Sequence, residues 1–303
     1  SPAEEWLHDG LDNLLAAQVL LPLAGEFEMA GNSGENQIIG AIYDRIDMGW
    51  PILSKRVRSI PEYGELFVAA FEDIIDPTQV NIAHIANAIS DFINFEWRSF
   101  DSPFDSYLKG NQKVLSQNQK SGMELFYGKG KCAECHQGPF FTDQEFHALA
   151  LPQFGPGRTR NLDPYVRDVG RMGETDRLED AYRFRTPALR NVALTGPYGH
   201  NGAYVTMEGI IRHHLDPLGS LVNWDPAQVI LPKAEWLEGI DFIVLEDRLE
   251  MKRLKSHLDI QPLDLNEDEV ADLVTFMHAL TGKESIWGTL GRPDRVPSGL
   301  PVD

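Results

Sequence analysis

Apolar residues recur every three to four positions along much of the chain, and no segment shows the strict alternation expected of a half-buried strand. Residues 36–58 have this spacing, a second helix is predicted to begin near Pro61, and a third is predicted to follow Thr78, whose hydroxyl can cap it. The apolar stripes of the first and third segments are Ile38, Ile39, Ile42 and Ile46, and Ile82, Ile85, Ile89 and Phe92. The pattern predicts a mostly α fold without internal repeats.

The N-terminal part contains an apolar run over residues 14–21, which predicts a short buried helix that ends at Pro22. Residues 25–32 place carboxylates among apolar residues and are expected to form a loop. His8 and His84 are isolated histidines, which we interpret as packing or surface residues rather than as ligands.

Capping signals predict three helices in the second half of the chain. The capping residues are Ser116 with Gln119, then Thr206, then Asn266 with Glu269, and the glycines expected to end the first and last of these helices are Gly128 and Gly282. Residues 137–185 lack periodicity and are predicted to be loops, with no strand. Residues 217–262 contain no motif with a chemical meaning, and residues 286–303 are expected to form an extended tail.

Composition places the chain among ordinary globular proteins, with 42% hydrophobic and 24% charged residues. The 46 acidic residues against 27 Lys and Arg give a formal charge of −19, which repels nucleic acid and anionic lipid and attracts a basic redox partner. No apolar run reaches the roughly 18 residues of a membrane span, and the first residues lack the pattern of a signal peptide.

The candidate chemistry is concentrated at Cys132-Ala133-Glu134-Cys135-His136, a C-x-x-C-H sequence that contains both cysteines of the chain. This spacing is typical of covalent c-type haem attachment, in which the His supplies the proximal ligand. A disulfide is an alternative, and half of a zinc site is another, although a zinc site needs further ligands at matching spacings. Because such haem is attached outside the cytoplasm, we expect a periplasmic protein from which an export signal has been removed.

The second axial ligand decides the chemistry, because an iron with two strong protein ligands transfers electrons whereas an open site binds small oxidants. His213 and His214 are neighbours on a predicted helix and point about 100° apart, so at most one can face the haem. The residues alone leave the choice open. The candidates are His200, His213, His214, Met207, Met251 and Met277.

The sequence resembles the bacterial di-haem cytochrome c peroxidases and the related protein MauG over nearly its whole length. The resemblance rests on the haem motif with Thr142-Asp143 and Phe146-His147, and on the segment 184–202. The second of these reads Phe-Arg-Thr-Pro-Ala-Leu-Arg-Asn-Val-Ala-Leu-Thr-Gly-Pro-Tyr-Gly-His-Asn-Gly. A third matching segment runs from Asp9-Gly10 to Glu28-Met29.

The resemblance implies a cytochrome-c-like haem domain and part of a second one. Residues 109–285 would form the domain of the electron-transfer haem. Residues 1–108 would be the remainder of the domain that holds the first, peroxidatic haem, whose own C-x-x-C-H is absent. Gln18 and Glu28 match the residues that stand over the peroxidatic haem in the family. We therefore expect a partner chain or an N-terminal fragment to supply that second haem.

The resemblance also implies the remaining ligands and partners. His214 stands where the family has a Met or Tyr ligand, which predicts a bis-histidine iron of lower potential than a His/Met iron. His8 stands where peroxidases place a Trp between the haems, and Trp6 is a nearby substitute. The family's calcium site would use backbone carbonyls of Thr195 and Pro197, since calcium prefers oxygen ligands.

The expected function is that of an oxidoreductase chain that relays electrons to the peroxidatic haem for hydrogen peroxide reduction. A MauG-like oxidation of a protein substrate and a mono-haem electron-transfer subunit are the alternatives. The expected redox partner is a small protein such as a basic cytochrome or a cupredoxin, or the protein substrate itself.

Overall fold

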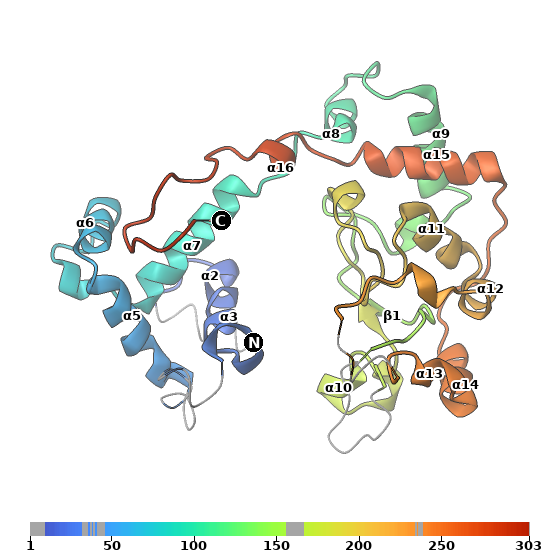
Figure 1. Cartoon of the computed structure of the whole chain (residues 1–303). Coiled ribbons are helices and arrows are strands. Elements are labelled where there is room, and N and C mark those ends of the chain that lie inside the picture. The colour runs from blue at the N-terminus through green and yellow to red at the C-terminus, as the bar shows by residue number, and fades with distance from the viewer. Residues whose placement is uncertain are drawn as a thin grey trace. The chain divides into compact units, whose positions relative to one another are not determined.

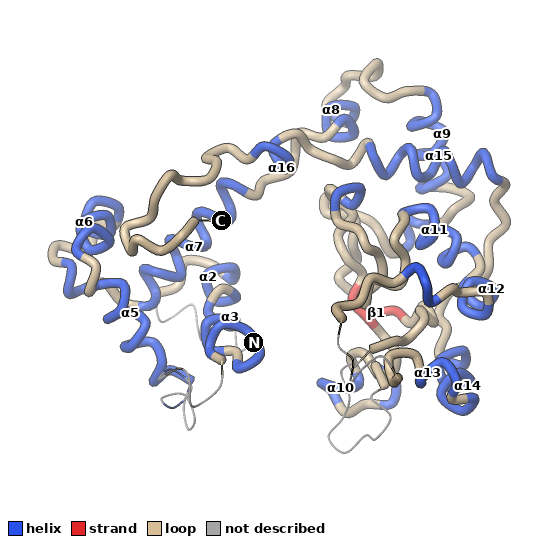
Figure 2. The backbone as a smooth tube through the Cα atoms, viewed as in Figure 1, coloured by secondary structure: helices blue, strands red, loops and turns tan. Residues whose placement is uncertain are grey.

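The computed structural model describes residues 10–31, 36, 38, 40, 46–155, 167–233, 235 and 239–302. Helices dominate this part of the chain, and the predicted mostly α class is confirmed (Figures 1 and 2). No helix among these residues combines the length and the apolar character that crossing a bilayer requires.

The chain divides into two compact units. The first contains Ser1–Arg98 and Ile286–Asp303, and the second contains Ser99–Ser285. The sequence placed the boundary after residue 108 and treated residues 286–303 as a separate tail. By its contacts, helix α8 (Pro103–Leu108) belongs instead to the second unit, and the tail belongs to the first.

The first unit is built from short helices around a small apolar core. They are α2 (Leu14–Gln18), α3 (Leu20–Ala24), α5 (Trp50–Arg58), α6 (Pro61–Ala70) and α7 (Ile82–Glu96), with a wide turn η1 (Glu26–Ala30) and the 3-10 turns η2 (Ile46–Gly49) and η3 (Pro77–Gln79). The core between α2, α3 and α7 contains Leu11, Ala16, Ala17, Leu20, Ala83 and Ala86. Polar bonds reinforce it, because Ser90 donates to the side chain of Asn13 at 2.9 Å and Asn87 donates to the carbonyl of Gly10 at 3.0 Å.

The predicted end of the first helix at Pro22 is wrong. The chain bends at Val19, between α2 and α3, and Pro22 lies inside α3. Proline is tolerated there because the first-turn N–H groups of a helix have no intrahelical acceptor. The run is also only half buried, since Leu14 is 60% exposed and Leu21 is 49% exposed.

The predicted cap at Thr78 is also wrong, although α7 itself and the start of α6 at Pro61 are confirmed. The side chain of Asn81 accepts from the backbone N–H groups of Ala83 and His84 and so caps α7. His84 in turn accepts from the Asn81 N–H at 3.1 Å and contacts Asp73, which is the structural role expected of it. Of the helix expected over residues 36–58, the structure describes the 3-10 turn η2 and then α5, which begins at Trp50. Residues 37, 39 and 41–45 lie outside the described residues.

The C-terminal tail is fastened to the first unit at two points. The carboxylate of Glu96 accepts from the backbone N–H groups of Thr289 and Leu290 at 2.8 and 2.7 Å. Arg295 forms a bidentate ion pair with Glu62, with both distances at 3.0 Å. The tail is therefore extended but attached to the first unit by the hydrogen bonds of Glu96 and the ion pair of Glu62.

The second unit carries the larger core. Its helices are α8, α9 (Gln117–Tyr127), α10 (Met172–Thr175), α11 (Met207–Leu215), α12 (Pro217–Val222), α13 (Ile243–Glu246), α14 (Arg248–Ser256), α15 (Glu267–His278) and the start of α16 (Glu284–Trp287). Short 3-10 turns are η4 (Cys132–Glu134), η5 (Leu178–Asp180), η6 (Val192–Leu194) and η7 (Pro226–Gln228). Helices α12, α13 and α14 fall in the segment where the sequence offered no motif.

Helices α9 and α15 pack side by side and carry the centre of this core (Figure 1). Phe126 and Phe276 are fully buried there with ring centroids 5.4 Å apart. The backbones come close because Gly122 faces Asp272, and a Cβ at residue 122 would collide with the Asp272 carbonyl oxygen. The capping boxes predicted for both helices are confirmed, and α9 ends before Gly128 as expected.

The expectation that residues 137–185 contain no strand is wrong in one detail. Strands β1 (Phe146–His147) and β2 (Phe184–Arg185) form an antiparallel pair, with Phe146 opposite Arg185. Two residues per strand are too few to show a periodic pattern in the sequence. The pair ties the chain that follows the C-x-x-C-H sequence to the segment 184–202.

Candidate haem site

A tight turn presents the two cysteines and His136. The chain leaves α9 through Lys131, whose φ of 55° is left-handed, and enters the 3-10 turn η4. The His136 N–H donates to the Cys132 carbonyl at 2.8 Å, which closes the turn. Both cysteines are free and partly buried, as attachment to two vinyl groups of one porphyrin requires.

The two thiols are protonated at neutral pH. Burial, the largest effect, raises the pKa of Cys132 to about 11. Burial also raises the pKa of Cys135, with smaller contributions from the charges of Asp143 and Glu134. Neither sulfur is the exposed, low-pKa thiolate of a catalytic cysteine. Partly buried, protonated thiols are consistent with cysteines that form thioether bonds to a haem.

His136 is held in one orientation by the loop that follows it. Its Nδ1 lies 3.0 Å from the carbonyl oxygen of Phe141, to which it donates when its proton is on Nδ1. Burial lowers the pKa of His136 to about 4, against the opposing effect of the Phe141 bond and with a further decrease from nearby His214. A neutral ring with its proton on Nδ1 leaves the lone pair of Nε2 for a metal.

His214 has the same arrangement on helix α11, which Thr206 caps as predicted. Its Nδ1 lies 2.8 Å from the carbonyl oxygen of Ile210, one turn earlier, so the Nε2 lone pair is again available. Burial lowers the pKa of His214 as well. The charge of His214 contributes to the lowered pKa of His136, which places His214 within electrostatic range of His136.

His213 is excluded by its hydrogen bonds. Its ring is fully buried, its Nδ1 lies 2.8 Å from the hydroxyl of Tyr204, and its Nε2 lies 2.7 Å from the carbonyl oxygen of Leu149. Both nitrogens are thus engaged, and the residue joins α11 to the segment 149–154.

Of the other candidate ligands, His200 is engaged by protein groups and the methionines pack in apolar clusters, one of which Cys132 also contacts. His200 contacts Asp168 at 2.9 Å and stacks on Phe184 with centroids 3.5 Å apart. Met207 and Met277 are buried in the core around α9 and α15, and Met251 packs on a separate cluster near Leu254. Methionine in such positions fills space rather than binding a metal.

The described residues fit a haem in a further respect. Gln153 is almost fully buried, yet neither polar atom of its amide has a hydrogen-bond partner among the described residues. Its neighbours Leu151 and Phe154 pack with Tyr204 and Ile210, beside the helix of His214. An unpartnered buried amide is costly, and the carboxylates of a haem are groups that could satisfy it.

Cys135, Asp143 and His147 place three ligand atoms within 4.8 Å of one another. His147 Nε2 lies 2.9 Å from the Asp143 carboxylate. A thioether sulfur at Cys135 would be a weaker metal donor than a thiolate, so haem attachment would weaken this set as a metal site. The Asp143 and His147 pair instead borders the attachment turn.

Gln18 and Glu28 lie in the first unit and have exposed side chains. Glu28 has φ −121° and ψ −109° within the wide turn η1, which projects it out of the helical path. Gly25 makes room for it, because a Cβ at residue 25 would lie 2.7 Å from the Glu28 carboxylate. Gln18 is the last residue of α2.

The remaining predicted positions are the pair His8 and Trp6 and the carbonyls predicted to bind calcium. His8 and Trp6 lie outside the described residues. Thr195 follows the turn η6, and its hydroxyl donates to the Val192 carbonyl at 3.2 Å. Pro197 lies two residues further along the chain. The calcium site at these carbonyls stays a prediction.

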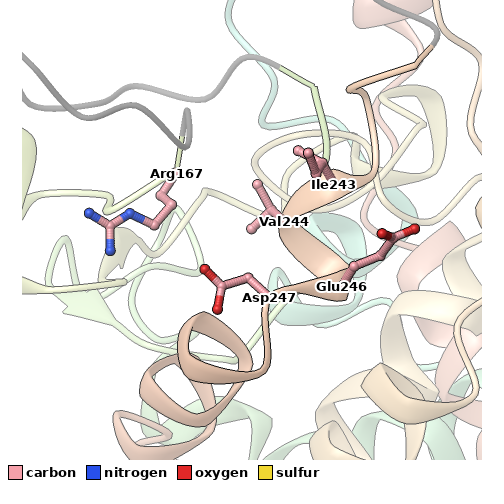
Figure 3. A pocket seen from close by; sticks show the side chains of 5 residues that line it. All are labelled: Arg167, Ile243, Val244, Glu246 and Asp247. Carbon is pink, nitrogen blue, oxygen red and sulfur yellow. The ribbon is translucent and has the colours of Figure 1, made fainter.

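A pocket of about 220 Å³ lies away from these residues (Figure 3). Arg167 stands across it from α13, which contributes Ile243, Val244 and Glu246, with Asp247 at the end of that helix. Arg167 also pairs at 3.2 Å with the fully buried Glu250, which accepts from the Tyr182 hydroxyl at 2.7 Å. This network is structural, and none of the predicted site residues lines the pocket.

Comparison with known proteins shows which proteins this chain is similar to. The family model "Di-haem cytochrome c peroxidase" matches residues 2–113. The cytochrome-c peroxidase IdrP1 of Pseudomonas sp. strain SCT is 26% identical over 298 residues, covering 92% of this chain and 65% of IdrP1. The cytochrome c551 peroxidase of Nitrosomonas europaea is 28% identical over 93% of this chain and 62% of its own length, and the MauG of Methylorubrum extorquens is 25% identical over 92% and 60%.

The chain is similar over most of its length to the di-haem cytochrome c peroxidases and to MauG. It spans less than two thirds of the length of these three relatives. Among solved structures, a MauG-like protein associated with microbial copper homeostasis matches with a TM-score of 0.58 and 27% identity over 89% of this chain and 69% of its own. The diheme peroxidase BthA of Burkholderia thailandensis shares the fold, with a TM-score of 0.53, 19% identity and coverage of 90% of this chain and 65% of its own.

Reasoning from the sequence missed two features of this chain. Gln153 gave no signal, because an orphaned amide is visible only once its surroundings are known. Arg190 lies inside the segment 184–202 that carries the resemblance, but a single arginine in a motif does not reveal which carbonyls it holds.

Proposed function

We propose that this chain carries the electron-transfer haem of a di-haem peroxidase, attached at Cys132 and Cys135 and held axially by His136 and His214. The observation that supports the proposal is the matching state of the two histidines. Each Nδ1 is bound to a backbone carbonyl, at 3.0 and 2.8 Å, so that each Nε2 can bind iron. The haem supplies reversible one-electron transfer when bound.

Glu28 and Gln18 serve a second haem in this proposal. That haem would come from a partner chain or an N-terminal fragment, since the only two cysteines here belong to one motif. The exposed Glu28 carboxylate would move a proton between the two oxygens of hydrogen peroxide, because a carboxylate can accept and return one proton in place. Gln18 would orient the peroxide by hydrogen bonding.

The protein would function in the periplasm, where c-type haem is attached. Calcium bound by the backbone carbonyls of Thr195 and Pro197 would stiffen that turn. The net charge of −19 favours a small basic electron donor. A MauG-like withdrawal of electrons from a protein substrate is a second candidate, because a histidine replaces the methionine expected of a peroxidase at residue 214.

The test is reconstitution. The chain is matured with haem, and its covalent haem content, spin state and peroxidase turnover are measured alone and with a second haem-bearing polypeptide. One low-spin haem per chain, with turnover only in the complex, supports the proposal. Cys132→Ser with Cys135→Ser must abolish attachment. Absence of covalent haem in the unsubstituted chain would refute the proposal, and one haem without turnover in any complex would leave only an electron-transfer subunit.

A further inference from the structure

Arg190 makes an unusual set of contacts close to the haem attachment turn. Its Nε donates to the Pro139 carbonyl at 2.6 Å, and its Nη1 donates to the Ser99 carbonyl at 2.6 Å. The same guanidinium forms a bidentate pair with Asp105 at 2.9 and 3.0 Å. Both side chains are nearly buried. The planar guanidinium has five N–H donors on three nitrogens and so reaches three separated partners, whereas the three donors of lysine lie on a single nitrogen.

Pro139 belongs to the loop that holds His136. The Phe141 N–H donates to the Gly138 carbonyl at 3.2 Å, and the Thr142 N–H donates to the Gln137 carbonyl at 2.9 Å. The carbonyl of Phe141 is the acceptor for His136 Nδ1. Arg190 therefore holds the loop at Pro139, two residues before Phe141, whose carbonyl oxygen accepts the hydrogen bond from His136 Nδ1.

The other contacts of Arg190 belong to a well-anchored part of the same unit. Asp105 is fixed by Ser102, whose hydroxyl donates to it at 2.6 Å. Asn191, next in the chain, accepts from the Ser99 hydroxyl at 3.1 Å and from the Gly282 N–H at 2.9 Å. The guanidinium thus links the six-residue loop 137–142 to Ser99 and Asp105.

We propose that Arg190 is a positioning residue that sets the bond between His136 Nδ1 and the Phe141 carbonyl through its hold on Pro139. The inference rests on the proposed role of His136 as a haem ligand. A strong bond from Nδ1 makes an imidazole more basic and stabilises the oxidised metal. Releasing the loop weakens that bond and raises the reduction potential of the haem.

Three substitutions separate this role from a general effect on stability. Arg190→Lys keeps the charge beside Asp105 but loses the fork that reaches Pro139 and Ser99. Asp105→Asn removes the ion pair but leaves both carbonyl bonds. Arg212→Lys is the matched control, since Arg212 is a surface residue on the helix of His214 and pairs only with the exposed carboxylates Glu208 and Glu267 in the described part of the chain.

Two measurements are made on the full chain. The first is the midpoint potential of the haem-loaded protein, and the second is hydrogen exchange of the Phe141 and Thr142 amides in the haem-free protein. We expect Arg190→Lys to raise the midpoint potential by more than Arg212→Lys changes it. We also expect Arg190→Lys to speed exchange of the two amides about tenfold or more, as a loss of roughly 1.4 kcal/mol of local stability would. Asp105→Asn should lower thermal stability without either change.

The outcomes are decisive in each arm. An Arg190→Lys protein that matches Arg212→Lys in both measurements overturns the inference, as does an Asp105→Asn protein that shifts the potential equally. If no covalent haem forms, the proposed function fails, and exchange in the haem-free chain still decides whether Arg190 holds the loop.

Discussion

The rings of His213 and His214 stand at 86° to each other with their centroids 6.4 Å apart, although the residues are neighbours in sequence. Both nitrogens of His213 are hydrogen-bonded to protein groups, whereas the hydrogen bond of His214 to the Ile210 carbonyl involves only Nδ1, as its proposed role as an axial ligand requires. Because neighbouring residues on a helix point about 100° apart, the two histidines have different surroundings.

This division predicts different spectra for two variants of the haem-loaded chain. His214→Ala should convert the low-spin iron to high spin because an axial ligand is lost. His213→Asn should leave the iron low-spin while lowering thermal stability, since two buried hydrogen bonds are disturbed. Electron paramagnetic resonance distinguishes the two spin states. A low-spin His214→Ala protein would show that another residue binds the iron.

The buried histidines make the haem-free chain sensitive to acid. The pKa of His213 is lowered by burial to about 4, against an ordinary value of about 6.5. The unfolded chain therefore binds more protons between these values, and stability is full above about pH 6.5 and falls as the pH decreases toward 4. We expect His213 alone to account for a loss of about 2.5 kcal/mol between pH 7 and pH 4.5.

Urea unfolding at pH 7 and pH 4.5 measures this loss. His213→Gln should reduce the difference between the two pH values. His278→Gln is the control, because His278 is exposed at the end of α15. Equal pH dependence in all three proteins would contradict the assignment.

Gly25 should matter for turnover more than for folding. Its φ of −72° is open to alanine, but the added Cβ would press on the Glu28 carboxylate. We expect Gly25→Ala to lower peroxidase turnover of the reconstituted complex about tenfold, and Glu28→Gln to lower it about a hundredfold or more. Met29→Leu, at the exposed neighbouring position, is the control. Full turnover in Glu28→Gln would remove this residue from the mechanism.

Gly122→Ala tests the contact between α9 and α15. Alanine normally stabilises a helix interior by about 1 kcal/mol relative to glycine. Here the methyl group would collide with the Asp272 carbonyl and crowd Phe276, so we expect a loss of about 1–3 kcal/mol in the free energy of unfolding. Ser121→Ala, one position earlier in α9, should change it by less than about 0.5 kcal/mol. Denaturant unfolding of the haem-free chain gives both values.

Local chemistry explains which elements could be predicted. The capping boxes at Ser116 and Asn266 depend on residues three apart, and both helices begin where those residues predict. Asn81 rather than Thr78 caps α7 because Asp76 engages the Thr78 hydroxyl and N–H, a competition that spacing alone does not reveal. The haem motif is also local, whereas the isolation of Gln153 and the reach of Arg190 depend on segments more than forty residues away.

The attachment of the tail by Glu96 and Glu62 has a consequence for biosynthesis. The first unit receives its last residues, 286–303, only after all of the second unit has been translated. The first unit therefore cannot be completed before the second unit has emerged, and Glu62 and Glu96 have these partners only once residues 286–303 have been synthesised.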